Sequence, residues 1–246
     1  MNPIDRLPAS AIRVPIVKQE ASYGCGPAAV LSVLQYWLPV RYSTVDQNDL
    51  HAQLNCDKDT GCEPAPMVEL FREAGLVPKL SMENTTFEDL EAAIARREPP
   101  IVCFQAWRSA GKPWSETWDY GHYAVVVDLD AENVYLSDPA NICGPYASIP
   151  REEFGQRWHD LVWSEPEERA NRTERIAIFV AAAKPRFMVE METRPISADN
   201  GRGSNRRPVT GVILTNCQDE SSSARQPRPQ VARTTVSMER SAPQRR

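Results

Sequence analysis

Apolar side chains follow one another almost without interruption at residues 28–38, which predicts a helix that is buried on every side. Shorter stretches carry apolar residues at helical spacing and predict helices that present one face to the core. These stretches are residues 67–74, residues 85–97 and residues 150–161. Gly75 is placed to end the first of them, and Pro99 with Pro100 terminates the second.

Two of these helices carry additional local signals. Thr85-Thr86-Phe87-Glu88 has the pattern of a capping box, which predicts a helix start at this point. Phe154 is separated from a tryptophan by one helical turn, so both aromatic rings are expected to pack on a sheet.

Four apolar runs of strand length predict the sheet. They cover residues 101–105, residues 121–128, residues 133–138 and residues 175–180. The polar stretch at residues 129–132 is a hairpin-length connection, so the second and third runs are expected to pair antiparallel. Together these elements predict an α+β fold, with a layer of helices against an antiparallel sheet.

Cys25 stands immediately before the buried helix, in Tyr23-Gly24-Cys25-Gly26-Pro27. A thiol at a helix N-terminus has a lowered pKa, because the helix dipole and the unpaired N–H groups of the first turn favour the thiolate. Proline fits the first turn, where its missing N–H costs nothing. Cys25 is therefore a candidate nucleophile; the alternative is a buried free cysteine at the start of a core helix.

His122 opens the first strand of the predicted hairpin, and Asp138 ends the second. In an antiparallel pair these two positions lie at the same end, so their side chains are expected to touch. Asp128 and Asp130 lie at the far end of the hairpin and are poor partners for His122. A histidine oriented by a carboxylate and facing a thiol is the general arrangement of base, orienting group and nucleophile.

Gln19 lies six residues before Cys25. Its side-chain amide can turn in beside the backbone N–H of Cys25, and two such donors form an oxyanion hole. His159 is the competing histidine; it falls within the helix predicted at residues 150–161, where a surface or packing role is expected.

In combination, these motifs resemble the papain-like cysteine peptidases, and within them the bacteriocin-processing peptidases that trim double-glycine leader peptides. The resemblance covers roughly residues 13–164 and implies the papain-like fold. It also implies roles for four residues: Cys25 as nucleophile, His122 as general base, Asp138 as its orienting residue and Gln19 in the oxyanion hole.

The sequence departs from the members of that family that are linked to exporters. Those members usually carry an acidic or amide residue just before the nucleophile and another cysteine shortly after it. Gly24 and Ala29 occupy these positions here, and the chain has no room for a membrane domain and an ATPase. A stand-alone relative is therefore the better match.

The expected reaction is hydrolysis of a peptide or protein substrate through a thioester on Cys25. A transpeptidase or amidase would use the same acyl-enzyme and pass it to an amine, and a product assay with an added amine separates the two. A catalytically silent, peptidase-like binding module is the third hypothesis, and the reactivity of Cys25 tests it.

The net charge has opposite signs in the two parts of the chain. Residues 191–246 contain ten Arg and five acidic residues, a net charge of +5, so the total of −5 leaves −10 for residues 1–190. The last part is rich in Pro, Ser, Gly and Arg and offers little apolar surface to bury, which predicts a disordered tail. We therefore expect a catalytic domain at residues 1–190 and a tail at residues 191–246. The basic tail could contact an anionic partner; no specific nucleic acid is indicated.

No segment reaches the roughly 20 apolar residues that a membrane span needs. The first residues lack the apolar core of a signal peptide, so a cytoplasmic location is expected. No cofactor is implied. His51, Cys56 and Cys62 lack the spacing of a zinc site, and no metal is expected. The two cysteines could form a disulfide if the protein were exported.

The loop before His122 holds four large aromatic residues: Trp107, Trp114, Trp118 and Tyr120. Loops that lead into catalytic residues often shape the cleft. The alternative is an aromatic cluster packed beneath a long loop. Both interpretations are open at this point.

Overall fold

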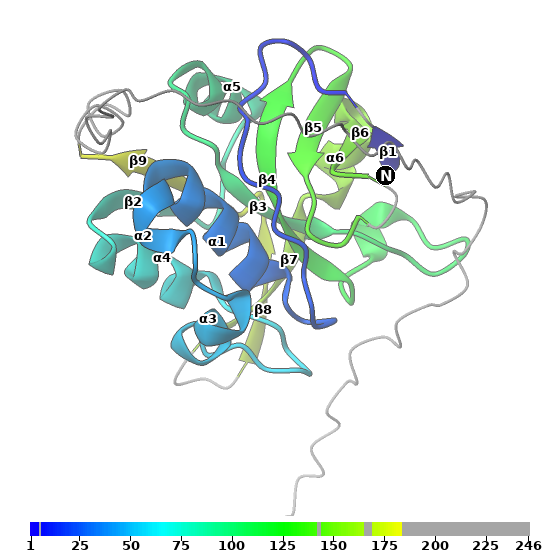
Figure 1. Ribbon diagram of the computed structural model, residues 1–246. Coiled ribbons are helices and arrows are strands. Elements are labelled where there is room, and N and C mark those ends of the chain that lie inside the picture. Colours follow the sequence, from blue (N-terminus) through cyan, green and yellow to red (C-terminus); the bar gives the residue numbers. More distant parts are fainter. Residues whose placement is uncertain (5, 142–143, 165–168, 184–246) are drawn as a thin grey trace, which may run out of the picture.

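The computed structural model describes residues 1–4, 6–141, 144–164 and 169–183 (Figure 1). The predicted tail lies outside these residues. The helices are α1 (Cys25–Trp37), α2 (Pro39–Tyr42), α3 (Gln47–Gln53), α4 (Pro64–Glu73), α5 (Phe87–Ala95) and α6 (Arg151–Arg157), with a short 3₁₀ helix η1 (Trp114–Glu116). The strands are β1 (Asn2–Ile4), β2 (Leu76–Ser81), β3 (Ile101–Gln105), β4 (Gly121–Leu129), β5 (Asn133–Ser137), β6 (Tyr146–Pro150), β7 (His159–Ser164), β8 (Arg169–Glu174) and β9 (Ala177–Ala182).

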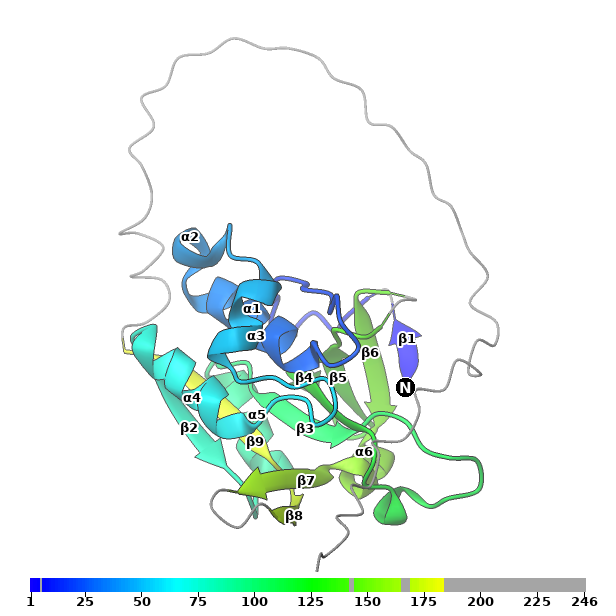
Figure 2. The ribbon, with the colours of Figure 1, turned by 90° about the horizontal axis from the view of Figure 1, so that it is seen from below.

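Seven of the strands form one sheet in the order β1-β6-β5-β4-β3-β9-β2, and every neighbouring pair is antiparallel. β7 and β8 form a separate antiparallel ribbon. In Figure 2, α1, α2 and α3 lie on one side of the central strands, while α6, β7 and β8 lie on the other. The α+β fold and the predicted antiparallel sheet are confirmed.

α1 is the central helix, and it packs against β4. Of its residues only Gln35 is not buried, which agrees with the uninterrupted apolar run in the sequence. Because a helix that is apolar on all sides must be enclosed, α1 is covered by the sheet together with α2, α3 and α4. This packing fixes the direction of α1 and therefore the position of its N-terminus.

The helix predicted at residues 85–97 is α5, which begins at Phe87 and ends at Ala95, two residues inside each predicted bound. Thr86 is the N-cap and Asp89 completes a capping box, so the box lies one residue later than the pattern Thr85–Glu88 suggested. α4 begins at Pro64, earlier than predicted, since proline is well suited to a first helical turn. Gly75 follows its last turn with φ of +86°, as expected for a residue that ends a helix.

The helix predicted at residues 150–161 is too long, because α6 ends at Arg157. The Arg157 guanidinium is buried and donates to the carbonyls of Gln105 and Ala106, at 2.8 Å each. The Trp158 indole N–H donates to the carbonyl of Ile176 at 2.9 Å. These bonds to distant backbone replace the helical pattern, and the chain continues as β7 from His159.

The last strand is also shifted. β9 runs from Ala177 to Ala182, whereas the sequence suggested residues 175–180. Arg175 has φ of +58° and therefore lies in the turn between β8 and β9. Four strands carried no clear pattern of their own: β1, β2, β6 and β8.

Candidate active site

Cys25 is the first residue of α1, as predicted, and its thiol is buried and takes part in no disulfide. The first turn of α1 contains no acidic side chain, so no residue of the helix itself offsets the dipole at this end. Gly26 follows, and its α-carbon faces Met67 and Cys62 so closely that an added Cβ would lie 2.6 Å from Met67 Cε. The start of the helix is therefore packed tightly against its surroundings.

His122 is the second residue of β4 and is 1% exposed. Its Nε2 lies 2.7 Å from Asp138 Oδ1, so the contact that the hairpin predicted is present. The thiol of Cys25 also forms a hydrogen bond with the His122 side chain. Since Nε2 faces the carboxylate, Nδ1 is the ring nitrogen that remains for the thiol.

Asp138 follows the last residue of β5 and is 1% exposed. Its Oδ1 accepts a second hydrogen bond from the backbone N–H of Ala140 at 2.8 Å. Its Oδ2 has no hydrogen-bond partner among the described residues. A pocket of about 270 Å³ opens beside Asp138 and Trp107. The carboxylate is thus held in place through one oxygen, the one that faces His122.

The electrostatics of the pair favour a charged imidazole. Burial by itself lowers the pKa of His122, but the adjoining Asp138 carboxylate and the Cys25 thiol outweigh it and raise the pKa to about 10. Burial would raise the pKa of Asp138, yet the charge and the hydrogen bond of His122 lower it overall. At neutral pH the site therefore holds an imidazolium between the Asp138 carboxylate and the sulfur of Cys25.

Gln19 is bonded to the loop that follows Asp138 and to the loop that leads into Cys25. Its backbone N–H donates to the carbonyl of Pro139 at 3.1 Å, which ties it to the residue after Asp138. Its Nε2 donates to the carbonyl of Ala21 at 2.9 Å and to that of Ser22 at 3.4 Å. Both acceptors belong to the loop that leads into Cys25, and Oε1 is buried without a hydrogen-bond partner among the described residues.

The tryptophans of the loop before His122 play two different roles: one lines the cleft, and the others pack beneath the loop. The Trp107 ring lies 5.4 Å from the His122 ring, centre to centre, and Trp107 is 36% exposed, so this residue lines the site. Trp114 instead lies beneath the guanidinium of Arg157 at 4.0 Å. The Trp118 ring packs against the His159 ring, tilted by 41° and 4.2 Å away, centre to centre. One tryptophan therefore contributes to the cleft, and the other two pack away from it.

The residues considered as alternatives to His122 and Asp138 form other contacts. His159 belongs to β7 and not to a helix, and its Nε2 lies 2.7 Å from the carbonyl of Thr117. Burial lowers the pKa of His159, which suits a neutral packing residue. Asp128 accepts a hydrogen bond from Ser10 Oγ at 2.6 Å, and Asp130 accepts bonds from the backbone of its own turn.

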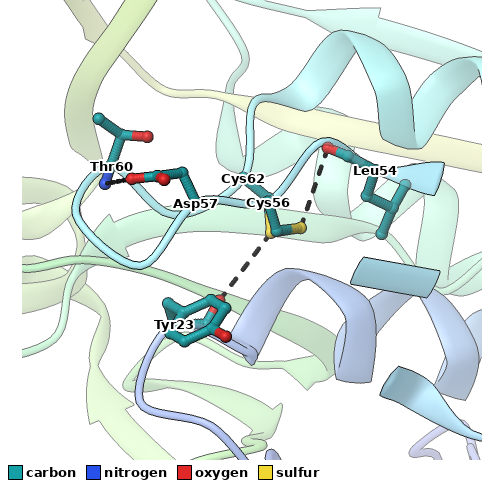
Figure 3. Close-up of a disulfide and its surroundings, with 6 residues drawn as sticks. All are labelled: Tyr23, Leu54, Cys56, Asp57, Thr60 and Cys62. Carbon is teal, nitrogen blue, oxygen red and sulfur yellow. Dashed lines mark hydrogen bonds between the residues drawn. A yellow bond between two sulfur atoms is a disulfide. The ribbon is translucent and has the colours of Figure 1, made fainter. Parts of the chain in front are cut away.

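Cys56 and Cys62 are joined in a disulfide, so their sulfurs are bonded to each other (Figure 3). The sulfur of Cys62 also lies 3.9 Å from the carbonyl of Tyr23, in the loop before Cys25. His51 packs edge-on against the Tyr23 ring at 5.1 Å. The segment after α3 is thereby fastened beside the start of α1.

The Peptidase_C39 like family matches residues 11–163, which is more than half of the chain and includes every candidate residue. The chain belongs to the Peptidase_C39 like family. It is a cysteine-type peptidase with a papain-like fold, as the resemblance implied. No curated protein matches the chain.

The chain is similar to several solved structures. A putative C39-like peptidase from Bacillus anthracis is similar with a TM-score of 0.50 and 18% identity, over 70% of this chain and 96% of that chain. The peptidase domain of Streptococcus ComA, a bifunctional ABC transporter of a quorum-sensing pathway, gives 0.48 and 18%, over 69% and 99%. A double glycine motif protease from an AMS/PCAT transporter, in complex with its leader peptide, gives 0.46 and 18%, over 73% and 99%.

Three contacts near the site had no clear signal in the sequence. Trp107 stood out only as one of several aromatics, and the disulfide was a conditional expectation. The third contact is that of Gln47 with the backbone on both sides of Gln19. A lone glutamine at the start of a short helix has no pattern that would have singled it out.

Proposed function

We propose that this C39-like peptidase hydrolyses peptide bonds with Cys25 as nucleophile, His122 as acid and base, and Asp138 as the group that orients His122. The observation that supports this most strongly is the chain of contacts from the Cys25 thiol through the His122 ring to Asp138, with 2.7 Å between Nε2 and Oδ1. All three side chains are buried, so their interactions are only weakly screened by water.

In the first half of the reaction the Cys25 thiolate attacks the carbonyl carbon of the scissile peptide bond and forms a carbon–sulfur bond. The His122 imidazolium gives its Nδ1 proton to the leaving amine nitrogen as the carbon–nitrogen bond breaks. In the second half His122 takes a proton from water, which attacks the thioester. The carboxylic acid product leaves, and the thiolate and imidazolium are restored.

The negative oxygen of each tetrahedral intermediate needs donors. The backbone N–H groups in the first turn of α1 have no acceptor within the helix. Gln19 Nε2 carries two N–H groups; the shorter bond to Ala21 orients the amide, and the 3.4 Å contact to Ser22 is the one that an oxyanion would replace. We therefore place Gln19 in the oxyanion hole.

A reactive thiol probe tests the proposal directly. A peptidyl electrophile should label Cys25, and mass spectrometry locates the adduct. Cys25→Ser should abolish both labelling and hydrolysis of a peptide panel while the protein stays folded. Cys103→Ser is the matched control, because Cys103 is the other buried cysteine outside a disulfide among the described residues. Labelling of Cys103 in place of Cys25 would contradict the proposal.

The same panel addresses the substrate. We propose an unfolded peptide or protein segment, and a quenched peptide with Gly-Gly before the scissile bond, compared with its Ala-Ala counterpart, tests whether this chain prefers the double-glycine motif. Faster cleavage of the Gly-Gly peptide would assign that preference; equal rates would leave a general peptidase.

We also propose that residues 1–190 carry the activity and that residues 191–246 form a separate tail. The catalytic candidates all precede residue 139, and β9, the last strand described, ends at Ala182. No helix among the described residues is long and apolar enough to cross a membrane. The cytoplasmic location stays a prediction; the Cys56–Cys62 disulfide would persist more readily in an oxidising compartment.

A further inference from the structure

Gln47 is a buried amide whose hydrogen bonds go to neither the nucleophile nor the base. It is the first residue of α3 and is 5% exposed. Its Nε2 donates to the carbonyl of Lys18 at 2.5 Å, and its Oε1 accepts from the backbone N–H of Glu20 at 3.3 Å. These two backbone groups stand immediately before and after Gln19. One side chain therefore holds the backbone on both sides of Gln19.

The segment around Gln19 needs such support, because residues 13–19 belong to no helix or strand. On its other side the segment is tied to the loop after β5, through the bond from the Gln19 N–H to Pro139 and through Lys18 Nζ, which donates to Gly144 at 2.8 Å. Gln47 provides the opposite anchor. A second bond from α3, between Asn48 and the Glu20 carboxylate, is exposed and contributes less.

We propose that Gln47 is the positioning residue for Gln19 and thereby sets the geometry of the oxyanion hole. This inference rests on the proposed function, in which Gln19 stabilises the oxyanion. A displacement on the order of 1 Å in a catalytic group can reduce the rate about 100-fold. Loss of the Gln47 bonds should therefore reduce oxyanion stabilisation without touching the thiol or the imidazole.

Two small probes separate these effects without knowledge of the natural substrate. The para-nitrophenyl ester of N-acetylglycine acylates the thiolate through a tetrahedral oxyanion and releases nitrophenolate, which is coloured. Iodoacetamide alkylates the same sulfur by displacement of iodide from a saturated carbon, and no oxyanion forms. The ratio of acylation to alkylation at Cys25 therefore reports on the oxyanion hole alone.

The variant of choice is Gln47→Met, which keeps the length of the side chain and removes both hydrogen bonds. We expect the acylation rate constant to fall on the order of 10-fold to 100-fold, while alkylation of Cys25 keeps its rate and pH profile. Gln19→Ala should lower acylation on the order of 100-fold to 1000-fold. In the double variant the loss should equal that of Gln19→Ala alone, because Gln47 acts only through Gln19.

Gln53→Ala is the matched control, since Gln53 lies on the same helix and its amide is exposed; it should leave both rates unchanged. If Gln47→Met fails to fold, Gln47→Glu keeps the acceptor for Glu20 and removes the donor to Lys18, and a selective loss of acylation is again expected.

Multiplicative losses in the double variant, or equal losses of acylation and alkylation in Gln47→Met, would overturn the inference and leave the proposed function intact. An unchanged acylation rate in Gln19→Ala would remove Gln19 from the oxyanion hole and would overturn the inference with it. Loss of the ester reaction in Cys25→Ser is the separate check on the nucleophile.

Discussion

The carboxylate of Asp160 lies directly against the α-carbon of Gly121, the residue before His122. A Cβ added to Gly121 would lie 1.9 Å from Asp160 Oδ2 and 2.4 Å from its Cγ. The carboxylate is fixed in this position, because Gln105 Nε2 donates to its Oδ1 at 3.0 Å and the Cys103 thiol donates to its Oδ2 at 3.2 Å. Position 121, next to His122, therefore requires glycine because any larger side chain would collide with the Asp160 carboxylate.

Gly121→Ala should consequently destabilise the protein and displace His122. We expect the free energy of unfolding to fall by about 1–3 kcal/mol, the usual cost of forcing extra volume into a packed core. Gly155→Ala is the control, since a Cβ there would lie 3.7 Å from Phe87, in ordinary contact. Urea unfolding of both variants measures the difference. Equal stability of the two variants would show that Asp160 moves aside without cost.

The charge of Asp138 should control the alkaline side of the pH profile. His122 has a pKa raised to about 10, so its imidazolium persists through neutral pH and is lost as the pH rises toward that value. Asp138→Asn removes the carboxylate that raises this pKa, so the alkaline limb of the acylation rate should move to lower pH. Stopped-flow acylation between neutral and strongly alkaline pH measures the shift.

His159→Ala is the control for that experiment. Its ring contacts Trp118 and the carbonyl of Thr117, so the substitution should lower stability and leave the alkaline limb in place. A silent Asp138→Asn together with an inactive, folded His159→Ala would reverse the assignment of the base and its orienting residue.

The Cys56–Cys62 disulfide should contribute to stability more than to chemistry. It closes a loop with a sequence separation of 6, for which chain entropy gives about 2 kcal/mol. Replacement of both cysteines by serine should lower the free energy of unfolding by about that amount. Calorimetry measures the loss, and iodoacetamide mapping should still find Cys25 as the reactive thiol. Loss of Cys25 reactivity in a folded variant would mean that the disulfide holds the Tyr23 loop in its active position.

Removal of the tail should leave the catalysis unchanged. A chain that ends at Glu190 retains every strand of the seven-stranded sheet and all the proposed catalytic residues. Its kcat for peptide hydrolysis and its melting temperature should match those of the full chain. Only a salt-sensitive association with an anionic partner should be lost. A folded, shortened chain without activity would show that the tail takes part in the reaction.

The sequence by itself determined the elements that carry the chemistry. The apolar run after Cys25 could only become an enclosed helix, and the hairpin placed His122 and Asp138 at one end because side chains alternate along paired strands. Both conclusions rest on periodicity and short-range connection. For the same reason the start of α5 was found within one residue from its capping pattern.

Tertiary structure decided what periodicity does not encode. α6 stops at Arg157 because buried bonds to the end of β3 and to Ile176 outweigh the helical pattern that continued to residue 161. Gln47 meets the backbone beside Gln19 only because α3 folds back onto an irregular segment 27 positions away in the chain. Asp160 reaches Gly121 in the same way, across two separate sheets. Contacts of this kind depend on how elements far apart in sequence pack together, and no local sequence pattern predicts them.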